Sequence, residues 1–255
     1  MKRLLYQYGA LFFLIALSAC GGSKVLKESE PIVATQPLAA ASDQRLSVAL
    51  DWVIVRDGPG TWSRKAGWDE YLLRVKSESD QPVRIIRLIV VDSLGMPTES
   101  VADRKQLVKS SKETARRYKK SGIEVEAGSG RGTMKVAAVT ATGAGVGAAM
   151  GAGSFVGATS GAIVVGGMVL APVLAIGGVM RGVNQSKVNG VIKSRQTALP
   201  VNLVAGEEIA LDMFFPIAPS PKTIELTYSD TDGEHRIVID TSTALDGLHT
   251  VISAE

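Results

Sequence analysis

The sequence contains few of the residue types that most often carry chemistry. Its 255 residues include one cysteine, two histidines and only 5% aromatic residues. A disulfide within one chain needs two cysteines and is excluded. No cluster of histidine, cysteine and carboxylate residues has the spacing of a metal site, and no Gly-x-Ser-x-Gly motif of a serine hydrolase is present. We therefore expect no enzyme activity, cofactor or metal.

A large positive excess is also missing. The formal net charge is +3, and removal of residues 1–19 would reduce it to +1 because Lys2 and Arg3 lie there. Proteins that bind nucleic acid normally carry a marked basic excess. No nucleic-acid partner is expected.

The chain begins like an exported protein. Lys2 and Arg3 precede an apolar run at residues 10–17, and small residues follow. This order is typical of a secretory signal peptide, here residues 1–19. The run is short for a transmembrane helix, which is the alternative interpretation.

The motif LSAC at residues 17–20 resembles the lipobox of bacterial lipoproteins. The resemblance implies cleavage before Cys20 and acylation of its sulfur and new amino group, so membrane lipid is an expected partner. Aspartate after this cysteine favours the inner membrane in Gram-negative lipoproteins. Gly21 stands there, which implies the periplasmic side of the outer membrane rather than the inner membrane. A free structural thiol is the alternative role of Cys20.

Two blocks of alternating sequence predict a mainly β protein. Residues 20–44 are expected to be the lipidated cysteine and a flexible tether. Residues 45–98 contain about three strands, of which the first places Leu46, Val48, Leu50, Trp52 and Ile54 on one face. Residues 197–255 contain about four, with a turn at residues 205–207 and a hairpin at Asp232-Gly233. Together the blocks predict one immunoglobulin-like β-sandwich. Two separate small sheets are the alternative.

Residues 99–196 are expected to be an insertion that begins with a basic helix at residues 100–122. Val101, Val108, Ala115 and Tyr118 recur at roughly helical spacing. Such a helix can lie on an anionic membrane surface, and the alternative is a solvated helix. The basic residues predicted to face the membrane are Arg104, Lys105, Lys109, Lys112, Arg116, Arg117, Lys119 and Lys120.

The second part of the insertion has no charged side chain from Val136 to Met180. This length suits two membrane-spanning helices, and we expect a hairpin over residues 136–183 with arms at 136–157 and 162–183. Small residues at spacings of four let helices approach closely in lipid. We therefore expect self-association into a homo-oligomer. A disordered loop or a hairpin buried in a soluble oligomer is the alternative. The glycines predicted to pack are Gly143, Gly145, Gly147, Gly151, Gly153, Gly157, Gly161, Gly167, Gly178 and Gly182.

These glycine rows in a chain with a lipobox resemble the glycine-zipper segments of bacterial outer-membrane lipoproteins. The resemblance implies a structural or assembly role in the cell envelope, with another envelope protein as a further partner. A lipid-anchored module that binds a protein or glycan is the alternative function. A pore-forming protein is a third interpretation.

Several other motifs favour structural roles. The sequence GSGRGTMK at residues 128–135 lacks the Ser or Thr that follows the lysine of a Walker loop. Asp230, Asp232 and Glu234 crowd a turn that is expected to be solvated, and weak cation binding is the alternative. The three tryptophans, Trp52, Trp62 and Trp68, are expected to pack in or beside the core, and a binding groove is the alternative.

Overall fold

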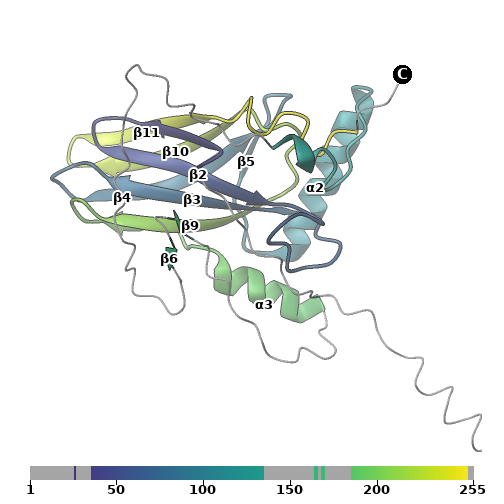
Figure 1. The fold of residues 1–255 in the computed structure, drawn as a ribbon, viewed down its shortest axis with the longest axis horizontal. Helices are drawn as coiled ribbons and strands as arrows, with labels where there is room; N and C mark the ends of the chain where they lie inside the picture. Colours follow the sequence, from purple (N-terminus) through teal and green to yellow (C-terminus); the bar gives the residue numbers. More distant parts are fainter. Residues whose placement is uncertain (1–25, 27–35, 135–163, 166–167, 170–184, 252–255) are drawn as a thin grey trace, which may run out of the picture.

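The computed structural model describes residue 26 and residues 36–134, 164–165, 168–169 and 185–251. Over these residues the protein is mainly β, with two antiparallel sheets and two helices packed against them (Figure 1). Sheet 1 has the order β1 (Ala39–Ser42), β2 (Leu46–Ile54), β3 (Asp69–Ser77) and β9 (Glu208–Phe215). Sheet 2 has the order β11 (Gly233–Asp240), β10 (Thr223–Asp230), β4 (Val83–Val91) and β5 (Pro97–Glu99), and β8 (Val201–Leu203) also pairs with β4.

Both sheets combine strands from the two sequence blocks. β9 pairs with β3 along its whole length, and β10 pairs with β4. The two blocks therefore form one structure, and the alternative of two separate small sheets is wrong. β10 and β11 form the predicted hairpin, in which Asp230 pairs with Gly233.

The inner faces of the two sheets form the main core. Tyr71 and Leu73 of sheet 1 pack with Ile85 and Leu226 of sheet 2, and all four are almost fully buried. The alternation predicted for residues 46–54 holds only as far as Leu50. A β-bulge between Leu50 and Trp52 shifts the register there, so that Val53 rather than Trp52 joins the buried core.

The predicted tether is partly built into the fold. Residues 39–42 form β1, which pairs with β2 because the Asp43 side chain closes the turn by accepting hydrogen bonds from the backbone of Arg45 and Leu46. Leu26 forms an isolated bridge with Ser63. Sheet 1 thus begins before residue 45, in contrast to the prediction.

Helix α2 (Arg104–Lys120) confirms the predicted basic helix, and the side chain of Asp103 caps it by accepting from the Gln106 amide. Its buried residues coincide only in part with the apolar residues that recur at helical spacing in the sequence. Leu107, Ser111, Thr114 and Tyr118 are buried, whereas Val108 and Ala115 are half-buried. The polar Ser111 side chain can be buried because its hydroxyl donates a hydrogen bond to the backbone of the β2–β3 loop.

Helix α3 (Gln185–Arg195) was not predicted. Within residues 136–183, the structure describes only β6 (Val164–Val165) and β7 (Met168–Val169), which form an antiparallel pair. These four residues are extended rather than helical, in contrast to the prediction. β-Branched valines favour strands over helices. A short 3-10 helix, η2 (Arg131–Thr133), precedes this region.

The remaining predicted hairpin, all ten listed glycines and Cys20 lie outside the described residues. Among the helices that are described, none combines the length and the hydrophobicity needed to cross a membrane.

Candidate functional site

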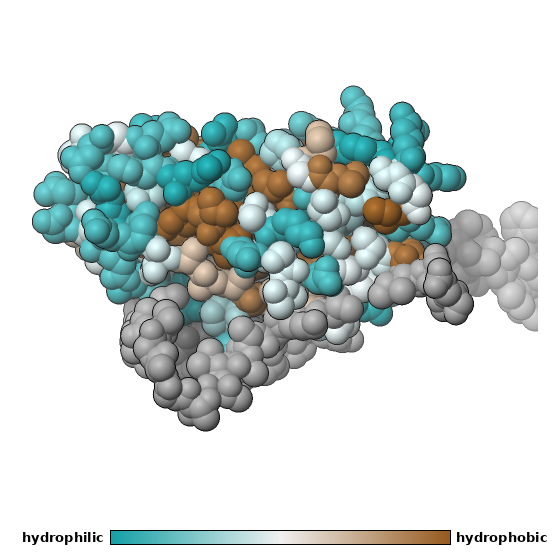
Figure 2. Space-filling view, turned by 90° about the horizontal axis from the view of Figure 1, so that it is seen from above, coloured by the Kyte–Doolittle hydropathy of each residue, from teal (hydrophilic) through white to brown (hydrophobic). Residues whose placement is uncertain are grey.

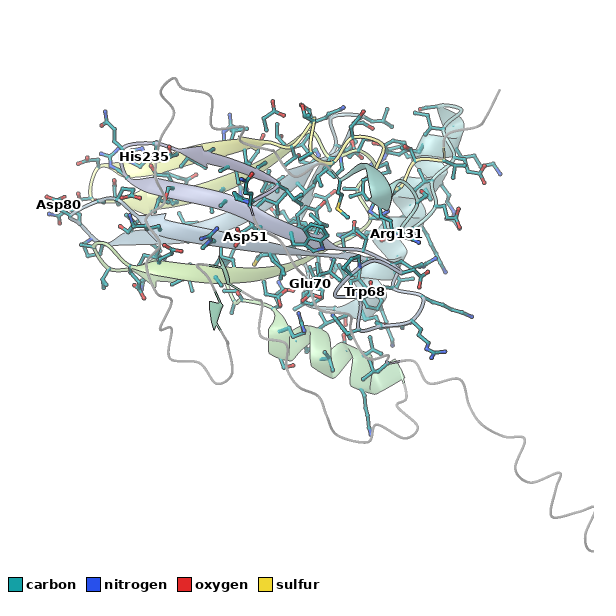
Figure 3. All side chains as sticks on the ribbon, viewed as in Figure 1. Asp51, Trp68, Glu70, Asp80, Arg131 and His235 are labelled. Carbon is teal, nitrogen blue, oxygen red and sulfur yellow. The ribbon has the colours of Figure 1, made fainter. Side chains whose placement is uncertain are left out.

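Within the described residues, buried tryptophan rings and the charged side chains that contact them lie at one end of the sandwich. Trp68, Glu70 and Arg131 lie at this end, and Asp80 and His235 lie at the opposite end (Figure 3). We call the first the helix-bearing end; it comprises α2, α3 and the β2–β3 loop at residues 55–68.

A second hydrophobic cluster holds the helix-bearing end together. This tryptophan cluster consists of Trp62, Ala66, Trp68, Leu107, Val188, Ile192 and Phe214. The rings of Trp62 and Trp68 are 6.2 Å apart, and Phe214 lies edge-on to Trp62 at 6.4 Å. A cavity of about 10 Å³ beside the two tryptophans has room for a single water molecule. Trp62 and Trp68 therefore pack as expected, and the cavity between them is too small to be a binding groove.

A buried ion network joins α3 to sheet 1. Arg195, the last residue of α3, donates from Nε to Glu70 Oε1 at 2.7 Å, and its Nη2 also contacts Glu70. Trp62 Nε1 donates to the other Glu70 oxygen at 2.7 Å. Arg195 Nη2 lies 3.4 Å from Asp212 Oδ2 on β9. One arginine thus compensates two carboxylates on the outer face of sheet 1.

The network shifts the pKa values of two of its members, Asp212 and Arg195. Burial, and then the neighbouring Glu70 carboxylate, raises the pKa of Asp212 well above its ordinary value. Burial opposes the charge of Arg195, but the carboxylates of Glu70 and Asp212 hold the pKa of Arg195 above its ordinary value. Arg195 is therefore a permanent cation that lies between Glu70 and a carboxyl, that of Asp212, that readily accepts a proton.

Asp69 and His249 form a buried pair that resembles part of a catalytic triad. His249 Nε2 lies 2.8 Å from Asp69 Oδ2. Its Nδ1 accepts a hydrogen bond from the Gly128 amide at 3.0 Å, so the ring hydrogen is assigned to Nε2. Both nitrogens are occupied and the ring is fully buried. The pair therefore has no nitrogen available to take a proton from a substrate.

The glycines of GSGRG at residues 128–132 serve a structural purpose. A Cβ on Gly128 would lie 2.3 Å from the Arg56 carbonyl oxygen, and one on Gly130 would lie 1.9 Å from that of Gly247. The same segment exchanges backbone hydrogen bonds with His249 through Glu126 and Ser129. Close backbone contact, rather than phosphate binding, explains this glycine spacing.

The predicted basic side chains of α2 differ in their surroundings. Arg104 lies 5.9 Å from the ring centre of Trp68, and Arg117 donates to Thr114 and lies 3.9 Å from Asp92. The other six are exposed: Lys105, Lys109, Lys112, Arg116, Lys119 and Lys120. α2 thus presents a cationic outer surface, whereas its inner face packs on the sandwich.

Two of the three carboxylates in the predicted acidic turn contact protein groups. Arg45 forms ion pairs with Asp230 and Asp232, and His235 contacts Asp230 at 3.0 Å. Within the described part of the chain, no group of three or more His, Cys, Asp or Glu side chains is arranged to hold a metal ion. Trp52 is half-buried against the main core.

Burial affects every tyrosine that follows the predicted signal peptide. It raises the pKa of Tyr118, of Tyr71, which also lies near Asp69, and of Tyr228, which donates to Asp43 at 2.6 Å. The folded protein therefore holds these protons more tightly than the unfolded chain. Their contribution to stability is complete below the unfolded pKa of about 10 and is lost as the pH rises through the folded values.

In a protein without residues 1–19, we expect tyrosinate absorbance to appear only together with alkaline unfolding. The measurement compares an absorbance titration with circular dichroism of the sheets, and free tyrosine amide is the control. Three tyrosines that titrate near the control value while the sheets stay intact would refute this expectation.

No protein-family model, curated protein or solved structure gives a significant match to this chain.

Proposed function

We propose that this protein is a lipid-anchored envelope protein with a structural or assembly role. Acylated Cys20 holds it at the outer membrane, and the sandwich lies on the periplasmic side. The uncharged segment at residues 136–183 inserts into the bilayer and associates with other copies through its glycine faces.

The position of Leu26 supports this proposal most directly. Leu26 packs against the tryptophan cluster, to which Val188 and Ile192 of α3 also belong. Cys20 lies six residues before Leu26, and the predicted hairpin ends just before α3 begins at Gln185. The lipid anchor and the end of the hairpin thus connect to one cluster, as two attachments to the same membrane require.

We also infer an immunoglobulin-like topology for the sandwich. The order β2-β3-β9 corresponds to strands A, B and E of that fold, and β11-β10-β4 corresponds to G, F and C. The insertion then falls between strands C and E. Both of its ends lie on the domain, which suits a hairpin that enters and leaves a membrane on one side.

Gly147→Leu is expected to reduce crosslinked oligomers of the membrane-bound protein, because a large side chain on the glycine face keeps two helices apart. The measurement is chemical crosslinking in membranes. The sandwich should be unaffected, as judged by its tryptophan fluorescence. Gly132→Leu is the matched control, since Gly132 is exposed and a Cβ added there would meet no neighbour within 4 Å.

Unchanged crosslinking of the Gly147→Leu protein would count against self-association. The alternative role, as a partner-binding module, would gain support if loss of function followed substitutions on the sandwich surface instead. Hydrophobic residues gather near the middle of one face of the molecule (Figure 2). Val238 of β11 is an exposed hydrophobic residue at which that alternative can be tested.

A further inference from the structure

Exposed cations on three neighbouring elements share the helix-bearing end. α2 contains eight basic residues and one acidic residue, Glu113. Arg64 and Lys65 are exposed in the β2–β3 loop, and Lys187 and Lys193 are exposed on α3. The three elements are in contact. The Ser111 hydroxyl of α2 donates to the Gly67 carbonyl oxygen at 2.7 Å, and the Arg104 amide donates to Asn189 Oδ1 of α3 at 2.9 Å.

The opposite end of the sandwich carries mainly exposed carboxylates. Exposed carboxylates occupy three of the four turns there: Asp43, Glu78, Asp80, Asp232 and Glu234. Figure 3 shows Asp80 and His235 at this end, far from Trp68. Among the cations there, Arg45 pairs with Asp230 and Asp232, and Lys76 pairs with Glu78, while Arg84 is exposed on β4. Carboxylates therefore predominate in these turns. On the three elements of the helix-bearing end, cations outnumber the exposed carboxylates of Asp57 and Glu113.

α2 is held with its apolar side turned into the protein. Leu107 and Tyr118 are fully buried. The Tyr118 hydroxyl lies 2.8 Å from the Ser93 hydroxyl and 3.3 Å from the Pro219 carbonyl oxygen. α2 cannot turn its apolar face into a bilayer without losing these contacts. It can meet a membrane only through its charged outer face.

The chain length before Leu26 places the lipid close to this surface. Leu26 packs in the tryptophan cluster together with Val101 and Val108, which flank the first turn of α2. Leu26 is the sixth residue after Cys20, and an extended segment of six residues reaches about 20 Å at most. A lipid on Cys20 therefore holds the helix-bearing end near the bilayer.

We propose that the helix-bearing end docks by charge on an anionic phospholipid leaflet and that the acidic turns point away from it. This deepens the proposed function and rests on it for the lipid at Cys20. Each basic side chain near such a surface strengthens binding about fivefold, and the attraction is screened by salt. The lipid then supplies attachment, and the cations set the orientation.

The orientation can be read from two matched positions. Gln106 on α2 and Gln81 beside Asp80 are both exposed glutamines, at opposite ends of strands about 30 Å long. Gln106→Cys or Gln81→Cys is introduced into the full chain and labelled with a fluorophore. The protein is placed on phosphatidylcholine vesicles with or without phosphatidylglycerol. A nitroxide quencher is carried in the lipid headgroups.

We expect strong quenching at position 106 and little at position 81 on anionic vesicles. The difference should become clearly smaller on neutral vesicles, in high salt, and in the triple variant Lys105→Glu, Lys112→Glu, Lys119→Glu, because only the lipid tether then holds the helix-bearing end near the bilayer. The difference in quenching should persist in a control triple variant, Arg84→Glu, Arg87→Glu, Arg236→Glu. This variant makes the same change in net charge, but on strands β4 and β11. Equal quenching at both positions, or a difference that ignores lipid charge, would overturn the proposal. Weak quenching at position 106 on anionic vesicles would also overturn it and point to an acidic protein partner.

Failure of the lipid anchor would be recognised separately. It would appear as an unmodified Cys20 by mass spectrometry. A chain without the lipid still tests the docking surface, because charge attraction alone recruits it to anionic vesicles. Quenching confined to position 106 then supports the orientation, and equal quenching contradicts it.

Discussion

Replacing Arg195 with methionine is expected to lower the free energy of unfolding by about 3–5 kcal/mol. The guanidinium donates to Glu70 at 2.7 Å and lies 3.4 Å from Asp212. Without it, the buried Glu70 carboxylate keeps the Trp62 hydrogen bond but loses its cation. Asp212, whose pKa is already raised by burial, would take up a proton more readily still. The remaining charge on Glu70 is then buried without a cation.

The tryptophans report this change directly. Trp62 and Trp68 belong to the cluster that holds α3, so loss of α3 packing should expose them and shift their emission to the red. The measurement is urea unfolding followed by tryptophan fluorescence. The double variant Glu70→Leu with Arg195→Met should be more stable than Arg195→Met alone, because removal of both partners leaves no uncompensated charge on Glu70. A single variant as stable as the parent would show that the network does not hold α3.

Gly130→Ala is expected to lower the free energy of unfolding by about 4 kcal/mol or more. Few single substitutions have so large an effect. Gly130 has a φ of 64°, which a side chain already disfavours. Its new Cβ would lie 1.9 Å from the Gly247 carbonyl oxygen, so the backbone beside His249 would have to move. The hydrogen bond between Gly128 and His249 would be strained with it.

Gly132→Ala is the matched control for this prediction. It lies two residues away, is exposed, and would bring its Cβ within 4 Å of no atom. It should change the free energy of unfolding by no more than about 0.5 kcal/mol, as substitutions at ordinary surface positions do. Equal denaturation midpoints for the two variants would contradict the close backbone packing of residues 128–130 against residue 247.

The sequence predicted those parts of the fold that follow from local patterns. Alternation identified the strands, and Asp232-Gly233 identified the β10–β11 hairpin, because turn chemistry is local. Val53 was missed as a core residue because a single bulge at Leu50/Trp52 moves the side chains that follow it in β2 to the opposite face of the sheet. α3 was missed since its apolar positions are few and its packing partners lie on distant elements.

The candidate site was less accessible to prediction. Glu70, Arg195 and Asp212 are each unremarkable in sequence and separated by many residues, so only the pairing of β3 with β9 and the docking of α3 bring them together. The basic residues of α2 were found because charge is visible in sequence. The burial of Ser111 and Thr114 on α2 could not be predicted from apolar spacing, since both residues are polar. Their burial depends on partners in other elements.

The central claim is that the glycine-rich segment is an integral membrane element in addition to the lipid on Cys20. Alkaline-carbonate extraction tests it most directly, in membranes carrying Cys20→Ala behind a replacement cleavable signal peptide. We predict that the unacylated protein stays in the membrane pellet without aggregating, because residues 136–183 hold it there. Release of the protein into the soluble fraction would contradict the account and leave the lipid as the sole anchor.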